Sequence, residues 1–536
     1  MRVRAMMAAL GWPLRDFAVH LHRSGASLAF VAPEDQLLTA TEINEWAWQG
    51  VAVNTAQFPW PQAPGYPAVW DEEAAVRTLR LMARGEANAA AIALMQAAKA
   101  HELPAFFDDD GLTLGAGEGG LTWPNDALPA EVPWRELHDI PTVLVTGSNG
   151  KTTTVRLLAA MFRKAGKRSG FNCTDGVFVG GECVESGDYS GPNGARRVLR
   201  DARVQAAVLE TARGGILRRG LAVHRADAAI VTNISPDHFG EYGVHDLSDL
   251  ADAKLVLARA IGEDGVLVLN ADDALLLEKS AKLTCPLAWF SLDDNHPHLV
   301  AHRRHGGATC GVADGVLTLE IRGIRYRLGP VDAMPLTLSG SARYNIANIA
   351  GAALVAACLG LSAEVIAAVL AGFGASREDN PGRLERWRIG DVSVLLDYAH
   401  NPEGLSGLLT VARSVGASTG GRLGLLLGQA GNRDDGAIRE LARTAAAAGP
   451  DFVVLKDLDG YMRGRAIGEV PGILRDELLR HGLPETNLRT ILPEVEAAQA
   501  MLAWARAGDV VVLPVHNLAA RAQVVTWLDA QVVDTR

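Results

Sequence analysis

Cysteine is scarce in this sequence of 536 residues, and its 5 cysteines are widely spaced. No two of them form a CxxC pair. Closely paired cysteines are the usual sign of a zinc site or a dithiol redox centre, and dense cysteines are the sign of a disulfide-stabilised secreted domain. We therefore expect neither class, and the composition favours a reducing, cytoplasmic compartment.

Long apolar runs and an excess of basic residues are also missing. No stretch approaches the ~20 apolar residues of a transmembrane helix. Gly11, Pro13 and Arg15 interrupt the short apolar run near the start, which argues against a signal peptide. With 62 acidic and 51 basic residues, the net charge is −11. Binders of polyanions are usually basic, so we expect no nucleic-acid or membrane partner.

The sequence does contain one pattern many times over: a short apolar run, a polar or glycine-rich cluster, and then a helical periodicity. Examples are PTVLVTGSNGKTTT (141–154), QAAVLETARGG (205–215) and VSVLLDYAHNP (392–402). Apolar strands that alternate with helices predict an α/β fold with a parallel sheet covered on both faces. Ligands bind such sheets at the carboxyl ends of strands, and the polar clusters fall there.

Two stretches of the sequence mark candidate domain boundaries. A stretch rich in Pro and Trp spans 122–134, and SREDNPGR spans 376–383. At about 150 residues per domain, the length corresponds to three or four domains. We predict three parts, at 1–137, 138–378 and 379–536. Alternating runs such as VLTLEIRGIRYRL (316–328) predict a small antiparallel addition within 285–340.

The strand-like PTVLV is followed by a glycine loop, by Lys151 and Thr152, and then by a helical pattern. This order is suited to a nucleoside triphosphate, because backbone N–H groups and the helix N-terminus face the phosphates. Lys151 is expected to reach the β- and γ-phosphates, and the Thr152 hydroxyl to bind Mg²⁺. The full GxxxxGK[ST] pattern is not met, since Val145 stands at its first glycine. A plain helix-entry turn is the alternative.

Charged residues follow the neighbouring strands. Glu210 ends an apolar run and suits a Mg²⁺ ligand, although a helix-start acid is an equal alternative. His238 follows the next strand and is a candidate metal ligand, or simply a solvated loop histidine. Lys254 shares one helical stripe with apolar residues. A lysine there is costly unless it is paired, snorkels or points into a site.

Basic residues are candidates for holding substrate. Arg213 and Arg218 follow the Glu210 strand, where a guanidinium can clamp a carboxylate, or they form an ordinary basic helix face. Arg463 and Arg465 follow DFVVLKDLD and are placed to close on phosphates or on an acidic substrate. Asp434 and its neighbour are suited to capping a helix.

Taken together, these motifs resemble the Mur ligase family of ATP-dependent ligases, which join a carboxylate to an amine. TGSNGKTTT (146–154) resembles its ATP loop, and NADD (270–273) its adenine-contacting turn. SARYNIANIAGAALVA (341–356) resembles a central-domain helix, while DYAHNP (397–402) and GNRDD (431–435) resemble C-terminal signatures. The resemblance implies a P-loop parallel-sheet central domain, a Rossmann-like C-terminal α/β domain and a small N-terminal α/β domain.

The resemblance also assigns roles to single residues. It implies ATP and Mg²⁺ as cofactors and a carbamylated Lys254 that supplies oxygens to a second Mg²⁺. The metal positions are Thr152, Glu210, His238 and Lys254, and the catalytic positions are Lys151, Lys254, His238 and Glu210. The nucleotide positions are Gly147, Ser148, Asn149, Gly150, Lys151, Thr152, Thr153, Asn270, Arg383 and Asp397. The candidate substrate residues are Arg213, Arg218, Arg463 and Arg465, which follow from their place after the strands, together with His400 and Asn401 of the DYAHNP motif.

Within the family, longer motifs resemble the Mur-like half of cyanophycin synthetases, which adds arginine to an aspartyl side chain. These motifs are SGDYSGPNGARRVL (186–199), LETARGGILRRGL (209–221) and MRGRAIGE (462–469). Asn432 stands where that branch has an acidic residue, and residues 1–137 are too short for its ATP-grasp half. An amino-acid or peptide substrate is thus implied, with arginine or an aspartyl peptide as candidates.

Other functions remain open from the sequence. A polyglutamate-type or cell-wall-peptide-type ligase keeps the chemistry and changes the substrate. A non-catalytic nucleotide-binding regulator on the same scaffold is a third possibility, against which stands the presence of Lys151, Thr152, Glu210, His238 and Lys254. A homo-oligomer is possible for an enzyme of this size.

Overall fold

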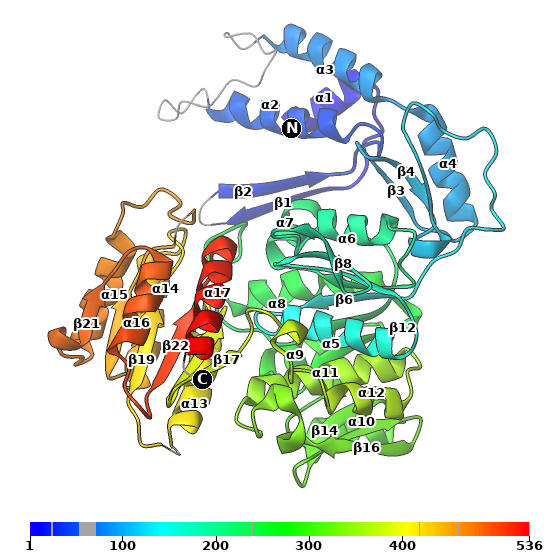
Figure 1. The fold of residues 1–536 in the computed structure, drawn as a ribbon. Helices are drawn as coiled ribbons and strands as arrows, with labels where there is room; N and C mark the ends of the chain where they lie inside the picture. The colour runs from blue at the N-terminus through cyan, green and yellow to red at the C-terminus, as the bar shows by residue number, and fades with distance from the viewer. Residues whose placement is uncertain (23–24, 53–70, 238, 418, 459, 535–536) are drawn as a thin grey trace. The chain divides into compact units, whose positions relative to one another are not determined.

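The computed structural model describes residues 1–22, 25–52, 71–237, 239–417, 419–458 and 460–534 (Figure 1). Its chain divides into two compact units. The first comprises Met1–Ile140, Leu199–Ala202 and Gly240–Gly243, and the second comprises Pro141–Val198, Arg203–Phe239 and Val244–Arg536. The predicted boundary near 378 lies inside the second unit and stays a prediction. Among the described helices, none combines the length and apolar character that crossing a bilayer requires.

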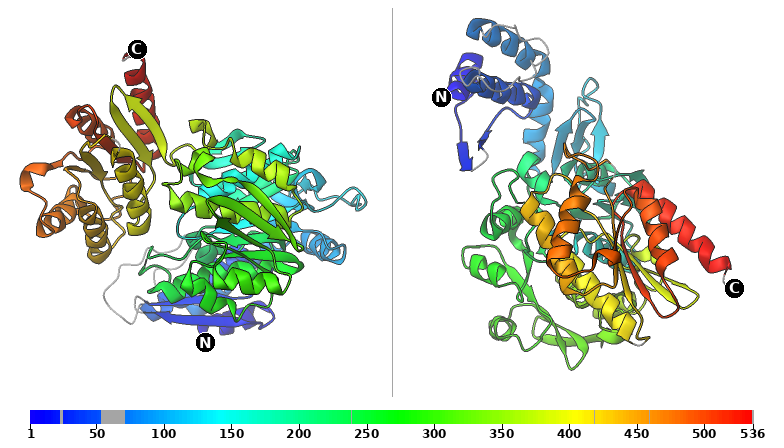
Figure 2. Two further views of the ribbon diagram at one scale, coloured as in Figure 1. Left: turned by 90° about the horizontal axis from the view of Figure 1, so that it is seen from below. Right: turned by 90° about the vertical axis from the view of Figure 1, so that its left-hand side faces the viewer.

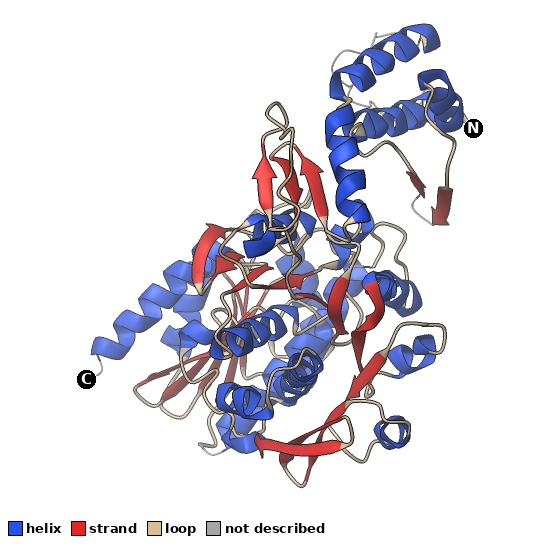
Figure 3. Ribbon diagram, turned by 90° about the vertical axis from the view of Figure 1, so that its right-hand side faces the viewer, coloured by secondary structure: helices blue, strands red, loops and turns tan. Residues whose placement is uncertain are grey.

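The first unit combines helices with two small antiparallel sheets (Figure 3). One group of elements shares an apolar cluster that contains Met6, Ile43 and Leu79. It consists of α1 (Arg2–Leu10), the hairpin β1 (Phe17–His22) and β2 (Gly25–Phe30), α2 (Leu37–Ala52) and α3 (Glu72–Glu86). The other group packs around Leu112 and Leu114. It consists of α4 (Ala89–Ala100), β3 (Ala105–Asp108), β4 (Gly111–Leu114) and β5 (Leu121–Trp123).

The second unit contains an 11-stranded sheet in the order β16-β15-β14-β13-β12-β11-β6-β10-β7-β8-β9. Its middle strands run parallel, and both ends are extended by antiparallel strands. The antiparallel addition predicted within 285–340 is therefore confirmed by β14, β15 and β16. The strands are β6 (Thr142–Thr146), β7 (Ser169–Cys173), β8 (Gly176–Val179), β9 (Glu182–Ser186), β10 (Ala206–Glu210), β11 (Ala226–Val231), β12 (Ile261–Asn270), β13 (Leu287–Phe290), β14 (Thr309–Ala313), β15 (Val316–Ile321) and β16 (Ile324–Pro330).

Helices cover this sheet and explain why its strands are apolar on both faces. The helix α11 (Arg343–Cys358) is buried over most of its length, because it packs against strands β11 to β15 and against α5 (Lys151–Lys164), which itself packs on β6, β7 and β10. Its small alanines allow this close packing, and Val355 joins one large apolar cluster with Leu158 and Phe290. Further helices are α6 (Pro192–Arg200), α7 (Arg213–Arg219), α8 (Leu247–Leu255), α9 (Ala274–Ser280), α10 (Pro297–Arg304) and α12 (Ala363–Leu370).

A 6-stranded sheet follows in the order β17-β18-β22-β19-β20-β21, parallel except for the edge strand β17. Its two faces carry separate apolar clusters, one with α13, α14 and α15 and the other with α16 and α17 (Figures 1 and 2). The predicted α/β class, with a Rossmann-like C-terminal part, is confirmed. The elements are β17 (Glu385–Ile389), β18 (Val392–Asp397), α13 (Pro402–Ala417), β19 (Leu423–Leu427), α14 (Asp435–Ala447), β20 (Phe452–Leu455), α15 (Glu469–Arg480), β21 (Leu488–Thr490), α16 (Glu494–Trp504), β22 (Val510–Pro514) and α17 (Leu518–Asp534).

Candidate functional site

The loop between β6 and α5 has the conformation that a phosphate cradle needs. Gly147 and Gly150 have φ angles of 149° and 84°, which residues with a side chain rarely adopt. A Cβ atom on Gly147 would collide with the Thr232 hydroxyl, and one on Gly150 would collide with the Asn348 amide. Both glycines are therefore required by conformation and by space. The loop leads directly into the N-terminus of α5, where backbone N–H groups favour an anion.

The segment after β11 holds this loop in place. Backbone N–H groups of Ser148 and Asn149 donate to Asn233, to its carbonyl at 3.0 Å and to its side-chain oxygen at 2.9 Å. The Thr232 hydroxyl donates to the Asn149 carbonyl at 2.6 Å. Asn270 acts one step further out, because its amide donates to the Thr232 carbonyl at 3.0 Å. Asn270, which is predicted to contact the nucleotide, thus supports the loop through Thr232.

Lys151 and Glu210 lie beside the loop with groups that suit a triphosphate and a divalent cation. The Lys151 ammonium donates to the carbonyls of Gly147 and Ser148, both at 3.0 Å. One oxygen of Glu210 accepts from the Thr152 hydroxyl at 2.8 Å, while its other oxygen, Oε1, is buried without a partner. Burial raises the pKa of Glu210, and Lys151 opposes the rise. A buried carboxylate oxygen with no donor beside a threonine hydroxyl fits a Mg²⁺ ion.

Lys254 reaches the same loop from α8. The residue is 2% exposed, and its side-chain nitrogen Nζ donates to the Gly147 carbonyl at 2.8 Å. Burial and the nearby charge of Lys151 lower the pKa of Lys254 well below its ordinary value, with Asp237 opposing. The lysine on an apolar stripe therefore points toward the phosphate loop, and its environment favours the neutral amine.

A cavity of about 160 Å³ opens beside the loop. The predicted residues that line it are Ser148, Asn149, Gly150, Lys151, Thr152, Thr153, Glu210, Arg383, Asp397 and His400. Predicted residues that the described cavity wall does not include are Gly147, Lys254, Asn270, Asn401, Arg213, Arg218, Arg463 and Arg465. Of these, Gly147 belongs to the phosphate loop, Lys254 and Asn401 donate to the loop, and Asn270 donates to Thr232, which supports it.

The far wall of this cavity comes from the segment after β18. The Asn401 amide donates to the Asn149 side-chain oxygen at 2.9 Å, and the Asn149 amide donates to Glu403 at 2.9 Å. Asp397 accepts from the backbone N–H of Leu384 at 2.7 Å, and burial raises the pKa of Asp397 against the opposing charge of Arg383. Residues about 250 positions apart in sequence thus form one cavity.

Arg383 joins the two sides of the cavity. Its guanidinium donates to the Thr174 hydroxyl at 2.9 Å and lies 4.5 Å from the centre of the Tyr398 ring. It is also 3.4 Å from the Thr152 hydroxyl. A fixed cation this close to the phosphate loop is suited to an anionic ligand.

The four predicted substrate arginines have different surroundings. Arg213 is buried at the start of α7, while the exposed Arg218 donates to the Gly214 carbonyl at 3.1 Å. Arg463 is exposed. Arg465 donates to the Gly431 and Arg433 carbonyls at 3.0 and 2.8 Å. In this structure Arg465 therefore braces the 431–435 loop.

The 431–435 loop also contacts the segment that follows β11. Arg433 forms an ion pair with Asp237 at 2.9 Å, and the His400 ring lies 4.0 Å from the same carboxylate. Asp434 caps α14 by accepting from the backbone N–H of Ala437 at 2.8 Å, as its position predicted. His238, the remaining predicted metal ligand, lies outside the described residues. Within the described part of the chain, no three His, Cys, Asp or Glu side chains are grouped to hold a metal.

Several residues of the cavity were not singled out from the sequence. Tyr344, Asn345 and Asn348 line it from the first turns of α11, and the Tyr344 hydroxyl is buried without a partner. Two asparagines three positions apart, in a helix that is apolar from Ile349 to its end, are a signal that was available. Thr174 and Glu403 offered no such local signal, because only the tertiary fold brings them to the loop.

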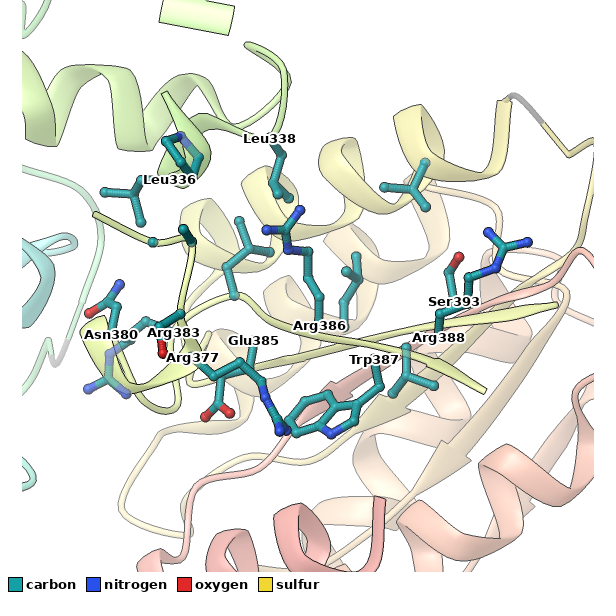
Figure 4. Close-up of a pocket in the computed structure, with 18 of the residues that line it drawn as sticks. Leu336, Leu338, Arg377, Asn380, Arg383, Glu385, Arg386, Trp387, Arg388 and Ser393 are labelled. Atoms are coloured by element: carbon teal, nitrogen blue, oxygen red, sulfur yellow. The ribbon is translucent and has the colours of Figure 1, made fainter. Parts of the chain in front are cut away.

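A larger cavity, of about 710 Å³, follows the edge strand β17. Figure 4 shows Arg386 and Trp387 pointing to opposite sides of this strand. Arg383 and Leu384 border both cavities, but the larger one contains no residue of the phosphate loop. We assign the functional site to the smaller cavity, because it holds the chemistry described above.

Most of the sequence after residue 144 matches domains of one known protein family. The Mur ligase middle domain matches residues 145–356, and the Mur ligase glutamate ligase domain matches 382–514. Cyanophycin synthetase of Crocosphaera subtropica is 37% identical over 386 residues, which are 72% of this chain and 43% of that protein. This chain therefore spans less than half of that relative.

Two further matches cover more of the other protein. UDP-N-acetylmuramoyl-L-alanyl-D-glutamate–2,6-diaminopimelate ligase of Gloeobacter violaceus is 30% identical over 380 residues, 69% of this chain and 70% of that one. The solved structure of E. coli FolC in complex with DHPP and ADP has a TM-score of 0.54 at 20% identity, and covers 73% of this chain and 89% of that one. The last similarity concerns the fold.

Proposed function

Because the chain belongs to the Mur ligase family, we propose that it is an ATP-dependent amide ligase that activates a carboxylate and joins it to an amine. The observation that carries this proposal is the phosphate loop with the Lys151 ammonium and the unpartnered Glu210 oxygen beside it. The loop suits the triphosphate, and the carboxylate oxygen suits the cation that accompanies it.

The residues in the cavity support a two-step reaction. A carboxylate oxygen of the substrate attacks the γ-phosphorus of ATP, and ADP leaves, which gives an acyl phosphate. The amine then attacks the acyl carbon and phosphate leaves with that oxygen. Lys151 and the loop N–H groups stabilise charge on the transferred group. Thr152 and Glu210 would hold Mg²⁺, which neutralises phosphate charge when bound.

Lys254 has the environment that a carbamate requires. A neutral amine adds CO₂ and loses one proton, and the lowered pKa of Lys254 favours the neutral amine. The product is an anion near the phosphate loop, where a second Mg²⁺ ligand is expected from the family resemblance. His238 is proposed for the same metal shell. The carbamate also removes the cost of a buried lysine that faces Lys151 and Arg213.

The proposed substrates are an amino acid or peptide, with arginine as amine and an aspartyl peptide as carboxylate. The match to cyanophycin synthetase supports this choice over the polyglutamate-type and cell-wall-peptide-type alternatives. Arg213 and Arg218 are proposed to hold the carboxylate substrate. His400, which lines the cavity, and Asn401, which donates to Asn149 of the phosphate loop, are proposed to contact the substrate as well. Arg463 and Arg465 are proposed to contact the phosphates or an acidic substrate when the C-terminal part closes.

The test is product formation. The purified chain is incubated with ATP, Mg²⁺ and pairs from a panel that contains arginine, glutamate, diaminopimelate, aspartyl peptides and glutamyl peptides. We expect an amide product by mass spectrometry and an equal amount of released phosphate with arginine and an aspartyl peptide. A different productive pair would keep the ligase and change its substrate. ATP binding without product from any pair would favour the regulatory alternative.

A further inference from the structure

Lys456, Glu494 and His516 form a polar cluster buried in the C-terminal part, outside the cavity wall. Their side chains are 0%, 1% and 4% exposed. Lys456 directly follows β20, Glu494 begins α16, and His516 lies two positions beyond β22. The cluster therefore sits at the carboxyl ends of strands, the edge at which the cavity also lies.

The hydrogen bonds of this cluster determine which ring nitrogen of His516 carries the hydrogen. Glu494 accepts from the Lys456 ammonium and from the backbone N–H groups of His516 and Asn517, the latter two at 2.9 and 3.2 Å. The His516 Nδ1 atom lies 3.4 Å from the Lys456 ammonium, which has only hydrogens to offer, so Nδ1 is the acceptor. Nε2 then carries the ring hydrogen and donates to the Ala399 carbonyl at 2.9 Å.

A second side chain holds the next carbonyl. The Gln429 amide donates to the His400 carbonyl at 3.0 Å, and its own oxygen accepts from the backbone N–H of Ala430. Gly428 makes room for the cluster, because a Cβ atom there would lie 2.9 Å from the Lys456 side chain. The successive carbonyls of Ala399 and His400 are thus each held by a side chain, and these two side chains follow different strands.

The segment held in this way is the one that meets the phosphate loop. Ala399 and His400 line the cavity, and Asn401 donates to Asn149 at 2.9 Å. A buried ion pair adds little net stability compared with apolar packing, but its members specify one geometry. Small displacements of groups that orient a substrate are costly, at about 100-fold in rate for 1 Å.

We propose that Lys456, Glu494 and His516 are positioning residues of the ligase: together they hold the 399–401 segment in register with the phosphate loop. Lys456 fixes Glu494, Glu494 fixes the backbone at His516, and His516 fixes Ala399. The kinetic tests of this inference rest on the proposed function. The position of the 399–401 segment can be tested without it.

The test compares three variants by hydrogen exchange and by kinetics. His516→Phe removes the donor to Ala399, and His516→Gln keeps a side-chain N–H. Asp509→Ala is the matched control, because Asp509 is 3% exposed and pairs with Arg422 at 2.5 Å, but at the amino end of β22. We expect faster amide exchange over 398–405 in His516→Phe only. kcat/KM for ATP should fall about 10- to 100-fold in His516→Phe, and His516→Gln should recover most of it.

Each result has one reading. Unchanged exchange over 398–405 in a folded His516→Phe would overturn the inference, whether or not the chain is a ligase. Equal losses of kcat/KM in His516→Phe and Asp509→Ala would also overturn it, because they indicate a general loss of stability. A wild-type chain that makes no product contradicts the proposed function alone, and the exchange result then decides the inference.

Discussion

Lys254 and Lys456 are both buried lysines of the second unit, but their partners differ. Lys254 donates to a backbone carbonyl and faces the charges of Lys151 and Arg213. Lys456 donates to the Glu494 carboxylate. Burial opposes ionisation of Glu494, yet the neighbouring Lys456 holds the pKa of this carboxyl well below its usual range. The first environment disfavours an ammonium, and the second requires one.

This difference separates two uses of a buried amine. An ammonium held by a carboxylate partner keeps its proton and therefore has no lone pair with which to react. An amine whose charge is disfavoured is available for reaction or modification, and such groups concentrate at functional sites. We therefore expect the same substitution to have opposite effects on stability at the two lysines.

The largest expected effect is on stability and comes from Lys456→Met. It leaves the Glu494 carboxylate buried without its cation, so the free energy of unfolding should fall by about 3–5 kcal/mol. Denaturant titration measures it. The double variant Lys456→Met/Glu494→Leu is the control and should recover most of the loss, because it removes both charges. A single variant as stable as the wild type would contradict the paired state of Lys456.

The next effect is catalytic and concerns Lys151. Lys151→Ala should lower kcat by about 100- to 1,000-fold, as for other groups that stabilise transition-state charge. The assay is phosphate release that depends on both substrates. Lys164→Ala is the matched control, because Lys164 is an exposed lysine of the same helix. Similar rates for the two variants would remove the phosphate loop from the proposed mechanism.

Chemical rescue distinguishes a modified lysine from a paired one. Lys254→Ala should lose activity on the order of 100-fold, and added formate or acetate should restore part of it, because a small carboxylate supplies the missing anionic oxygens. Lys456→Ala should show no rescue under the same conditions. The carbamate proposal fails if Lys254→Ala keeps full activity.

The smallest effect is the pH dependence of stability. The folded state holds the pKa of Lys254 below the value of the unfolded chain, so between these values the unfolded state binds more protons. Stability of the wild type therefore falls as the pH falls through this window, by at most about 1.4 kcal/mol per unit. In CO₂-free buffer, Lys254→Met should remove this slope and gain stability toward lower pH. A slope identical to that of the wild type would show that Lys254 keeps its proton.

The phosphate loop could be predicted because it depends on a local pattern, glycines between a strand and a helix. The apolar stripe marked Lys254 as unusual but left its direction open, and only the tertiary fold shows that it points to the Gly147 carbonyl. Contacts between distant segments could not be predicted in this way. Asn401 contacts Asn149 across about 250 positions, and Arg465 donates to carbonyls of the 431–435 loop, because tertiary packing decides both contacts.

The most direct test of the ligase proposal follows one oxygen atom. An aspartyl peptide labelled with ¹⁸O in its side-chain carboxylate is incubated with the enzyme, ATP, Mg²⁺ and arginine, and the released phosphate is analysed by mass spectrometry. An acyl phosphate transfers one carboxylate oxygen to phosphate, so we expect one ¹⁸O atom per phosphate for each amide formed. Amide formation with unlabelled phosphate, or phosphate release without amide, would contradict it.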